Sequence, residues 1–258
     1  MAWFMGIDIG SGTSKGVITK DGESIAVEIL ASGINYNEVA LKLREKLTAK
    51  ARLDPKEIAY AIATGHGSKN VSFCQEQVSD IRCCARGINR IYPSARTIVD
   101  IQGQSSQVIS IDEKGHVINH AASEKCATGS GRFFNILANV LQLELADIGS
   151  LSLTSNKPIY LNTGCAVFCE SEVVTRVSEG VPVEDILAGA VKVFAEKMGA
   201  LINRVGMRKQ CAISGGGTLN PGIVKALEQK LKTQLLVPQQ PQLVTALGAA
   251  CLAEEKWQ

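Results

Sequence analysis

Two cysteines each stand directly before a run of small residues that opens a helical stretch. Cys126 lies in "SEKCATGSGRFF", residues 123–134, and Cys165 lies in "NTGCAVFCESEV", residues 162–173. The N-terminus of a helix carries unpaired N–H groups and the positive end of the helix dipole, which favour an anion or a thiolate. Each cysteine is therefore either a ligand at a helix end or a small apolar residue in the packing.

Three further turns have the composition of phosphate and nucleotide sites. In "DIGSGTSK", Asp8 ends a strand and is followed by small residues whose N–H and hydroxyl groups can hold phosphate oxygens. These residues are Gly10, Ser11, Gly12, Thr13 and Ser14, with Lys15 placed to neutralise charge. The stretch "SGGGTLNP" leaves backbone exposed for a flat ring such as adenine, through Gly215, Gly216, Gly217 and Asn220.

A second aspartate turn, "DIQGQ", supplies Asp100, Gly103 and Gln104. Two carboxylates from two such turns suit Mg²⁺, which takes few direct carboxylates and keeps several waters. A glutamine in this position can orient an attacking water, as in several nucleotide hydrolases. We therefore predict that Asp8, Asp100 and Gln104 are catalytic residues of an ATP hydrolysis site.

The elements that hold these turns occur twice in the chain. The stretch "TIVDIQGQSSQVISIDEKGHVINHA" repeats "FMGIDIGSGTSKGVITKDGESIAVE", with Asp100 in the place of Asp8. Each copy reads as strand, aspartate, small-polar turn, strand, hairpin and strand. This pattern predicts an α/β protein with two duplicated domains, although two β-hairpins can also resemble one another by chance. The predicted domains are residues 1–93, joined by a final helix at 242–258, and residues 94–241.

Hydrophobic periodicity gives the remaining elements. Strands are predicted at 3–9, 15–20, 23–29 and 58–64, with a short strand near "PIYLNT", residues 158–163. Helices are predicted at 35–51, 129–143, 165–178, 183–205 and 243–255. A further helical stretch, which follows the loop after residue 64, is predicted to end at Arg90.

Composition excludes several classes of protein. The 258 residues carry a net charge of +2, which gives no basic patch for nucleic acid or a membrane surface. No apolar run approaches the ~20 residues of a membrane helix. The start "MAWFMGIDIG" reaches Asp8 early and lacks a charged leader region, so we expect no signal peptide and a cytoplasmic location. Eight cysteines without a CxxC pair disfavour zinc fingers and disulfide scaffolds.

The three turns in this order resemble the actin-like ATPase superfamily, whose two ribonuclease H-like, actin/hexokinase-like domains enclose a nucleotide cleft. The cysteine motifs "KCATGSGRFF" and "GCAVFCESEV" are similar to one branch of it. That branch contains the ATP-dependent activators of 2-hydroxyacyl-CoA dehydratases and the ATPase subunits of benzoyl-CoA reductase. The resemblance covers essentially the whole chain.

The resemblance implies one [4Fe–4S] cluster shared by two subunits, with Cys126 and Cys165 as its ligands in each. The count agrees with the chemistry, because a cubane takes four thiolates and a two-fold axis doubles the two cysteines of one chain. The turn residues Gly129 and Gly131 are expected to assist cofactor binding. The resemblance also implies ATP and Mg²⁺ as ligands, a ferredoxin or flavodoxin as electron donor, and an anaerobic setting. The partner that it implies is an iron–sulfur dehydratase or reductase. The dimer is formed by identical chains or with a paralogue.

The chain departs from this branch in the second aspartate turn. The family usually reads Asp-Ile-Gly-Gly-Gln-Asp-Ser-Lys there, whereas this chain has "DIQGQSSQ", with Gln102, Ser105 and Gln107 as the differences. These changes leave the rate of hydrolysis open. Cys169 replaces a common alanine and is either a packing residue or a spare ligand.

Two other functions fit the same turns. A sugar or acyl kinase of this fold needs a further general-base aspartate, and the sequence offers no obvious one. A non-catalytic nucleotide or redox sensor would explain the altered turn after Asp100. The main hypothesis is ATP-dependent electron transfer from the shared cluster to the partner enzyme.

Overall fold

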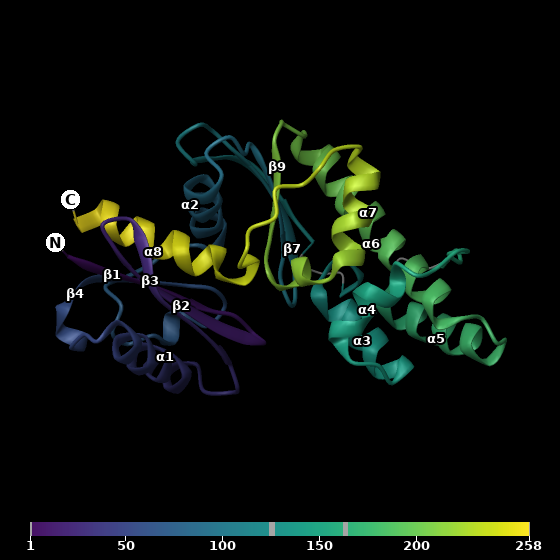
Figure 1. The fold of residues 1–258 in the computed structure, drawn as a ribbon, viewed down its shortest axis with the longest axis horizontal. Helices are drawn as coiled ribbons and strands as arrows, with labels where there is room; N and C mark the ends of the chain where they lie inside the picture. The colour runs from purple at the N-terminus through teal and green to yellow at the C-terminus, as the bar shows by residue number, and fades with distance from the viewer. Residues whose placement is uncertain (1, 124–126, 162–164, 258) are drawn as a thin grey trace. The chain divides into compact units, whose positions relative to one another are not determined.

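The structure is a computed structural model that describes residues 2–123, 127–161 and 165–257. The chain divides into two compact units. Unit 1 comprises Met1–Arg96, Ile111–Ile118 and Pro238–Gln258. Unit 2 comprises Thr97–Ser110 and Asn119–Val237. The ribbon is coloured along the chain in Figure 1.

Unit 1 is built on a five-stranded sheet in the order β3-β2-β1-β4-β5. Strand β1 is antiparallel to β2 and parallel to β4. The strands are β1 (Trp3–Ile9), β2 (Thr13–Lys20), β3 (Glu23–Ala31), β4 (Ile58–Thr64) and β5 (Glu76–Gln77). The helices are α1 (Tyr36–Ala51), α2 (Asp80–Ile91) and α8 (Val244–Trp257).

Helices cover both faces of this sheet, which explains why β1 is apolar at nearly every position. Met5, Ile7 and Ile9 alternate on one face and pack in the cluster that contains Leu43 of α1. Phe4, on the other face, packs in the cluster that contains Ala249 of α8. The alternation of β1 therefore decides which helix lies on each side of the sheet.

Helix α8 approaches β1 and α2 closely through glycines, and it lies beside α2 in Figure 1. A Cβ added to Gly6 of β1 would stand 2.0 Å from the carbonyl oxygen of Ala246. A Cβ added to Gly248 of α8 would stand 1.7 Å from the carbonyl oxygen of Cys83 in α2. Backbone atoms cannot yield as side chains do, so only glycine permits these contacts.

Unit 2 contains a four-stranded sheet in the order β8-β7-β6-β9. Strand β6 is antiparallel to β7 and parallel to β9, which repeats the arrangement around β1. The strands are β6 (Thr97–Ile101), β7 (Ser106–Ile111), β8 (Val117–Ala122) and β9 (Cys211–Ser214). The helices are α3 (Gly131–Leu141), α4 (Leu145–Ser152), α5 (Ala166–Ser178), α6 (Val183–Val205) and α7 (Pro221–Leu231).

The core of unit 2 joins the sheet to these helices. Val99 and Ile101 of β6 are fully buried with Phe133 of α3 and Phe194 of α6. Helices α6 and α7 lie side by side, as Figure 1 shows. The small-residue turns are thus carried at the ends of strands and helices that the core holds firmly.

The predicted α/β class and the repeated strand pattern are confirmed, and helices α1, α5 and α6 fall close to their predicted positions. The strand predicted near residues 158–163 is wrong over its described part, since residues 158–161 form no strand. Ile159 instead donates its N–H to the Asp185 carbonyl at the start of α6, at 3.2 Å. Helix α4 was not predicted. Within the described ranges, no helix combines the length and apolar character that crossing a membrane requires.

Candidate active site

Asp8 is the penultimate residue of β1, in a position set by both neighbouring strands. Its register partners are Lys15 on β2 and Thr64 on β4. Lys15 Nζ lies 3.2 Å from Asp8 Oδ2, and both side chains are largely buried. Lys15, which was predicted to neutralise charge at the phosphate turn, thus forms an ion pair with Asp8.

The turn after Asp8 is tied down by a residue that sequence reasoning missed. Ser32, directly after β3, donates its hydroxyl to the Gly10 carbonyl at 2.6 Å and its N–H to the Gly12 carbonyl at 3.1 Å. The hydroxyls of Ser14 and Ser32 lie 2.7 Å apart, and Ser14 is fully buried. Ser14 thus has a structural partner, whereas Gly12 of the same turn is exposed.

Asp100 is the penultimate residue of β6 and is fully buried. Two glutamine amides donate to its Oδ2 atom, Gln102 Nε2 at 2.7 Å and Gln107 Nε2 at 3.0 Å. The Ser214 hydroxyl donates to Oδ1 at 2.7 Å. Hydrogen bonds to an ionised acceptor are stronger than neutral ones, so this arrangement fixes the carboxylate firmly. Two of these donors, Gln102 and Gln107, are positions at which the chain differs from the family that its sequence resembles.

The two aspartates have matching surroundings, which extends the sequence repeat to side chains. Gln107 is the register partner of Asp100 on the antiparallel strand, as Lys15 is that of Asp8. A glycine with positive φ follows the parallel strand in each copy, Gly65 at 85° and Gly215 at 86°. An added Cβ would stand 2.3 Å from Asp8 Oδ1 at Gly65, and 2.9 Å from Asp100 Oδ1 at Gly215. Each carboxylate therefore rests against a glycine that no larger residue can replace.

The turn after Asp100 is bonded directly to the start of α3. Gly131 donates its N–H to the Gln102 carbonyl at 2.9 Å, and Arg132 donates to the Gly103 carbonyl at 2.8 Å. A Cβ on Gly131 would stand 3.1 Å from that Gln102 oxygen, so the glycine permits the approach. Gly103 and Gln104 are exposed. Gly129 ends the short 3₁₀ turn Ala127–Gly129 before α3.

The triple-glycine turn leads into α7. Asn220 caps this helix by accepting the Ile223 N–H at 3.1 Å. Its Nδ2 atom is buried and has no hydrogen-bond partner among the described residues. Gly216 and Gly217 form a 3₁₀ turn between β9 and the cap.

Of the two predicted cluster ligands, Cys126 lies outside the described residues. Cys165 is exposed and is the N-cap of α5, without a side-chain capping hydrogen bond. Cys169 is fully buried in the core of unit 2, which agrees with the packing alternative. Among the residues the structure describes, no three His, Cys, Asp or Glu side chains gather at a metal-binding distance.

Comparisons with known proteins match nearly the full length of the chain to one family of ATPases. The model of the BadF/BadG/BcrA/BcrD ATPase family matches residues 5–253. The 2-hydroxyisocaproyl-CoA dehydratase activator of Clostridioides difficile is 40% identical over 250 residues, covering 96% of this chain and 94% of the relative. The (R)-2-hydroxyglutaryl-CoA dehydratase activating ATPase of Acidaminococcus fermentans is 36% identical, covering 98% and 97%.

The similar solved structures include two proteins of the same dehydratase systems. The C. difficile activator with bound ADPNP has a TM-score of 0.93 at 37% identity, covering 99% of this chain and 95% of that one. Component A of the A. fermentans (R)-2-hydroxyglutaryl-CoA dehydratase has a TM-score of 0.96 at 34% identity, covering 100% and 99%. A glucokinase from Streptomyces griseus has a TM-score of 0.62 at 12% identity, covering 98% and 100%, and shares the fold alone.

Proposed function

We propose a function from the premise that the chain belongs to the BadF/BadG/BcrA/BcrD ATPase family. The protein is an ATPase, and we propose that ATP hydrolysis lets it pass single electrons to a partner iron–sulfur dehydratase or reductase of acyl-CoA substrates. The observation that carries this proposal is full-length similarity to two dehydratase activators, together with the duplicated aspartate sites. A ferredoxin or flavodoxin would supply the electrons.

The nucleotide half of the proposal rests on the two aspartates and their turns. Asp8 and Asp100 offer carboxylate oxygens, the ligand type that Mg²⁺ prefers directly or through water. Both are held at strand ends by defined partners, so little reorganisation is needed when the metal nucleotide binds. Gln104 is exposed beside Gly103 and is free of the Asp100 network, as a residue that positions water should be.

The cluster half rests on Cys165 and Cys126. An exposed thiol at the N-cap of a 13-residue helix fits a thiolate ligand, because the helix dipole stabilises the anion. Phe168 and Val174 of the same helix are 66% and 54% exposed, which suits a face covered by a second subunit. The bound cluster would supply low-potential, one-electron chemistry. We propose a homodimer that shares it.

The described residues also connect the two halves within unit 2. The carbonyls of Gln102 and Gly103 accept the first two N–H groups of α3, the helix that follows the Cys126 segment. A shift of the Asp100 turn on ATP binding would therefore move the start of α3 directly. We propose this connection as the path by which nucleotide state reaches the cluster.

The first test is the iron and acid-labile sulfide content of protein purified without oxygen. The proposal expects about four iron and four sulfide per dimer, lost in Cys126→Ala and in Cys165→Ala. Cys74→Ala is the matched control and should retain the cluster, because Cys74 is a partly buried residue of unit 1. An intact protein without iron after reconstitution would refute the electron-transfer proposal. Loss of ATP hydrolysis in Asp100→Asn tests the nucleotide half separately.

A further inference from the structure

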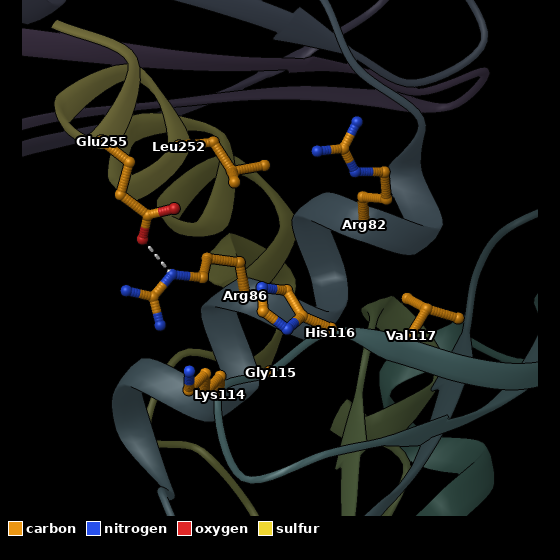
Figure 2. Close-up of a pocket in the computed structure, with 8 residues that line it drawn as sticks. All are labelled: Arg82, Arg86, Lys114, Gly115, His116, Val117, Leu252 and Glu255. Carbon is orange, nitrogen blue, oxygen red and sulfur yellow. Dashed lines mark hydrogen bonds and ion pairs between the residues drawn. The ribbon is translucent and has the colours of Figure 1, made fainter.

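Unit 1 contains a half-open cleft of about 510 Å³ that none of the residues discussed so far lines. Three elements form it: helix α2, helix α8 and the hairpin between β7 and β8 (Figure 2). Four side chains that carry or can take positive charge line its walls, namely Arg82, Arg86, Lys114 and His116.

Two of these four are oriented by carboxylates. Glu255 pairs with Arg86 Nε (Figure 2). Asn89 accepts from Arg86 Nη1 at 2.9 Å. Asp112 Oδ2 lies 3.1 Å from His116 Nδ1. These partners fix the guanidinium and the imidazole, and they leave Arg86 Nη2 and His116 Nε2 for another group.

The other two cations lack acidic partners. No ion pair joins Arg82 or Lys114 to a carboxylate anywhere in the part of the chain that the structure describes. Glu255 balances Arg86, and Asp112 beside His116 offsets one further charge when histidine is counted as neutral, so the cleft keeps one net positive charge from Arg82 and Lys114 together. Cations that come from separate elements and outnumber the nearby carboxylates create a positive potential that attracts an anion.

We infer that this cleft binds a small organic phosphate. Guanidinium groups match phosphate oxygens with paired hydrogen bonds, and Lys114 adds a point charge. Leu252 and Val117 give the cleft an apolar wall for the organic part of the ligand. The volume lies in the ~300–1,000 Å³ range of small-molecule sites, whereas a docking surface for a protein is flatter. This inference is independent of the proposed electron transfer.

The test is calorimetric titration of the full-length protein with phenyl phosphate, without magnesium and without added nucleotide, because ADP is itself an organic phosphate and would compete for the cleft. The double variant R82Q/K114Q should weaken binding by about tenfold or more. The matched variant K42Q/K56Q removes the same charge from exposed positions elsewhere and should change affinity by less than about twofold. Leu252→Ala should weaken phenyl phosphate but leave inorganic phosphate unchanged.

Three results would overturn the inference. Wild-type protein that takes up no phenyl phosphate at about 10 mM has no such site. Equal affinity in R82Q/K114Q and K42Q/K56Q would mean that binding is general attraction to net charge. An oligoglutamate peptide that binds more tightly than phenyl phosphate and competes with it would identify the cleft as a docking site for an acidic protein segment.

Discussion

Replacing Gln107 by leucine removes one hydrogen bond from a buried carboxylate with little change in side-chain volume. Gln107 is 4% exposed and Asp100 is 0% exposed, so water does not readily take the place of the lost amide. A hydrogen bond to a charged group contributes about 1.5–3 kcal/mol. Gln102 and Ser214 still donate to Asp100 in the variant. We therefore expect Gln107→Leu to destabilise unit 2 by about 2 kcal/mol.

The measurement is urea unfolding followed by far-ultraviolet circular dichroism, without nucleotide or cluster, because ligands that bind the folded state add their own stabilisation. Gln107→Lys is the informative companion. It recreates the Lys15–Asp8 ion pair of the first copy, so it should lose less stability than Gln107→Leu. Comparing the two variants thus separates the effect of removing a partner of the Asp100 carboxylate from the effect of exchanging that partner for a lysine.

A double-mutant cycle with Asp100→Asn identifies the mechanism. If the effect of Gln107 acts through the Asp100 carboxylate, the leucine substitution should cost clearly less in the Asp100→Asn background. An equal loss in both backgrounds would refute the reasoning, since the cost would then come from packing alone. So would a loss below about 0.5 kcal/mol in the parent protein.

Three further predictions concern packing, thiol reactivity and pH. Gly248→Ala should lower the stability of unit 1 by about 3 kcal/mol in thermal unfolding, because the added Cβ would overlap backbone atoms of α2. Gly12→Ala is the control: its added Cβ has no atom within 4 Å, so the loss of stability should be under about 1 kcal/mol. Iodoacetamide at about pH 8 should label exposed Cys165 quickly in cluster-free protein and should leave Cys83 unlabelled until the protein unfolds. The reason is that burial raises the pKa of the Cys83 thiol to about 12. Equal labelling of the two cysteines, measured by peptide mass spectrometry, would contradict this. A hydrogen bond from a lysine of α1 lowers the pKa of Glu28 below 4.5, so its stabilisation is present above pH 4.5 and is lost as pH falls through the lower value. Acid unfolding of Glu28→Gln should therefore show a shallower pH dependence than wild type in that window, and an unchanged profile would count against the ion pair.

Local pattern was sufficient to predict the repeat and the positions of both aspartates. Each aspartate follows an apolar strand and precedes small residues, and this signal lies within a few residues of sequence. Ser32 and the Gln107 interaction were not predictable in this way. Ser32 lies 22 residues from the carbonyl of Gly10 that it contacts, and only the cross-strand register brings Gln107 opposite Asp100. The departures in "DIQGQSSQ" were visible in the sequence, but only the structure shows that Gln102 and Gln107 both donate to Asp100 Oδ2.

Helix α8 also sets an order of events during protein synthesis. Its residues, Val244–Trp257, pack against β1, Trp3–Ile9. More than 200 residues are therefore synthesised between β1 and the helix that packs on it. Until then, the face of the sheet that carries Phe4 and Ile62 lacks Ala249 and Ala253, the residues that α8 contributes to its cluster, while the segments of unit 2 through Val237 have already been synthesised. Unit 2 can therefore complete its fold first, although it is second in the sequence. The uncovered face of unit 1 is where a chaperone would bind the nascent chain.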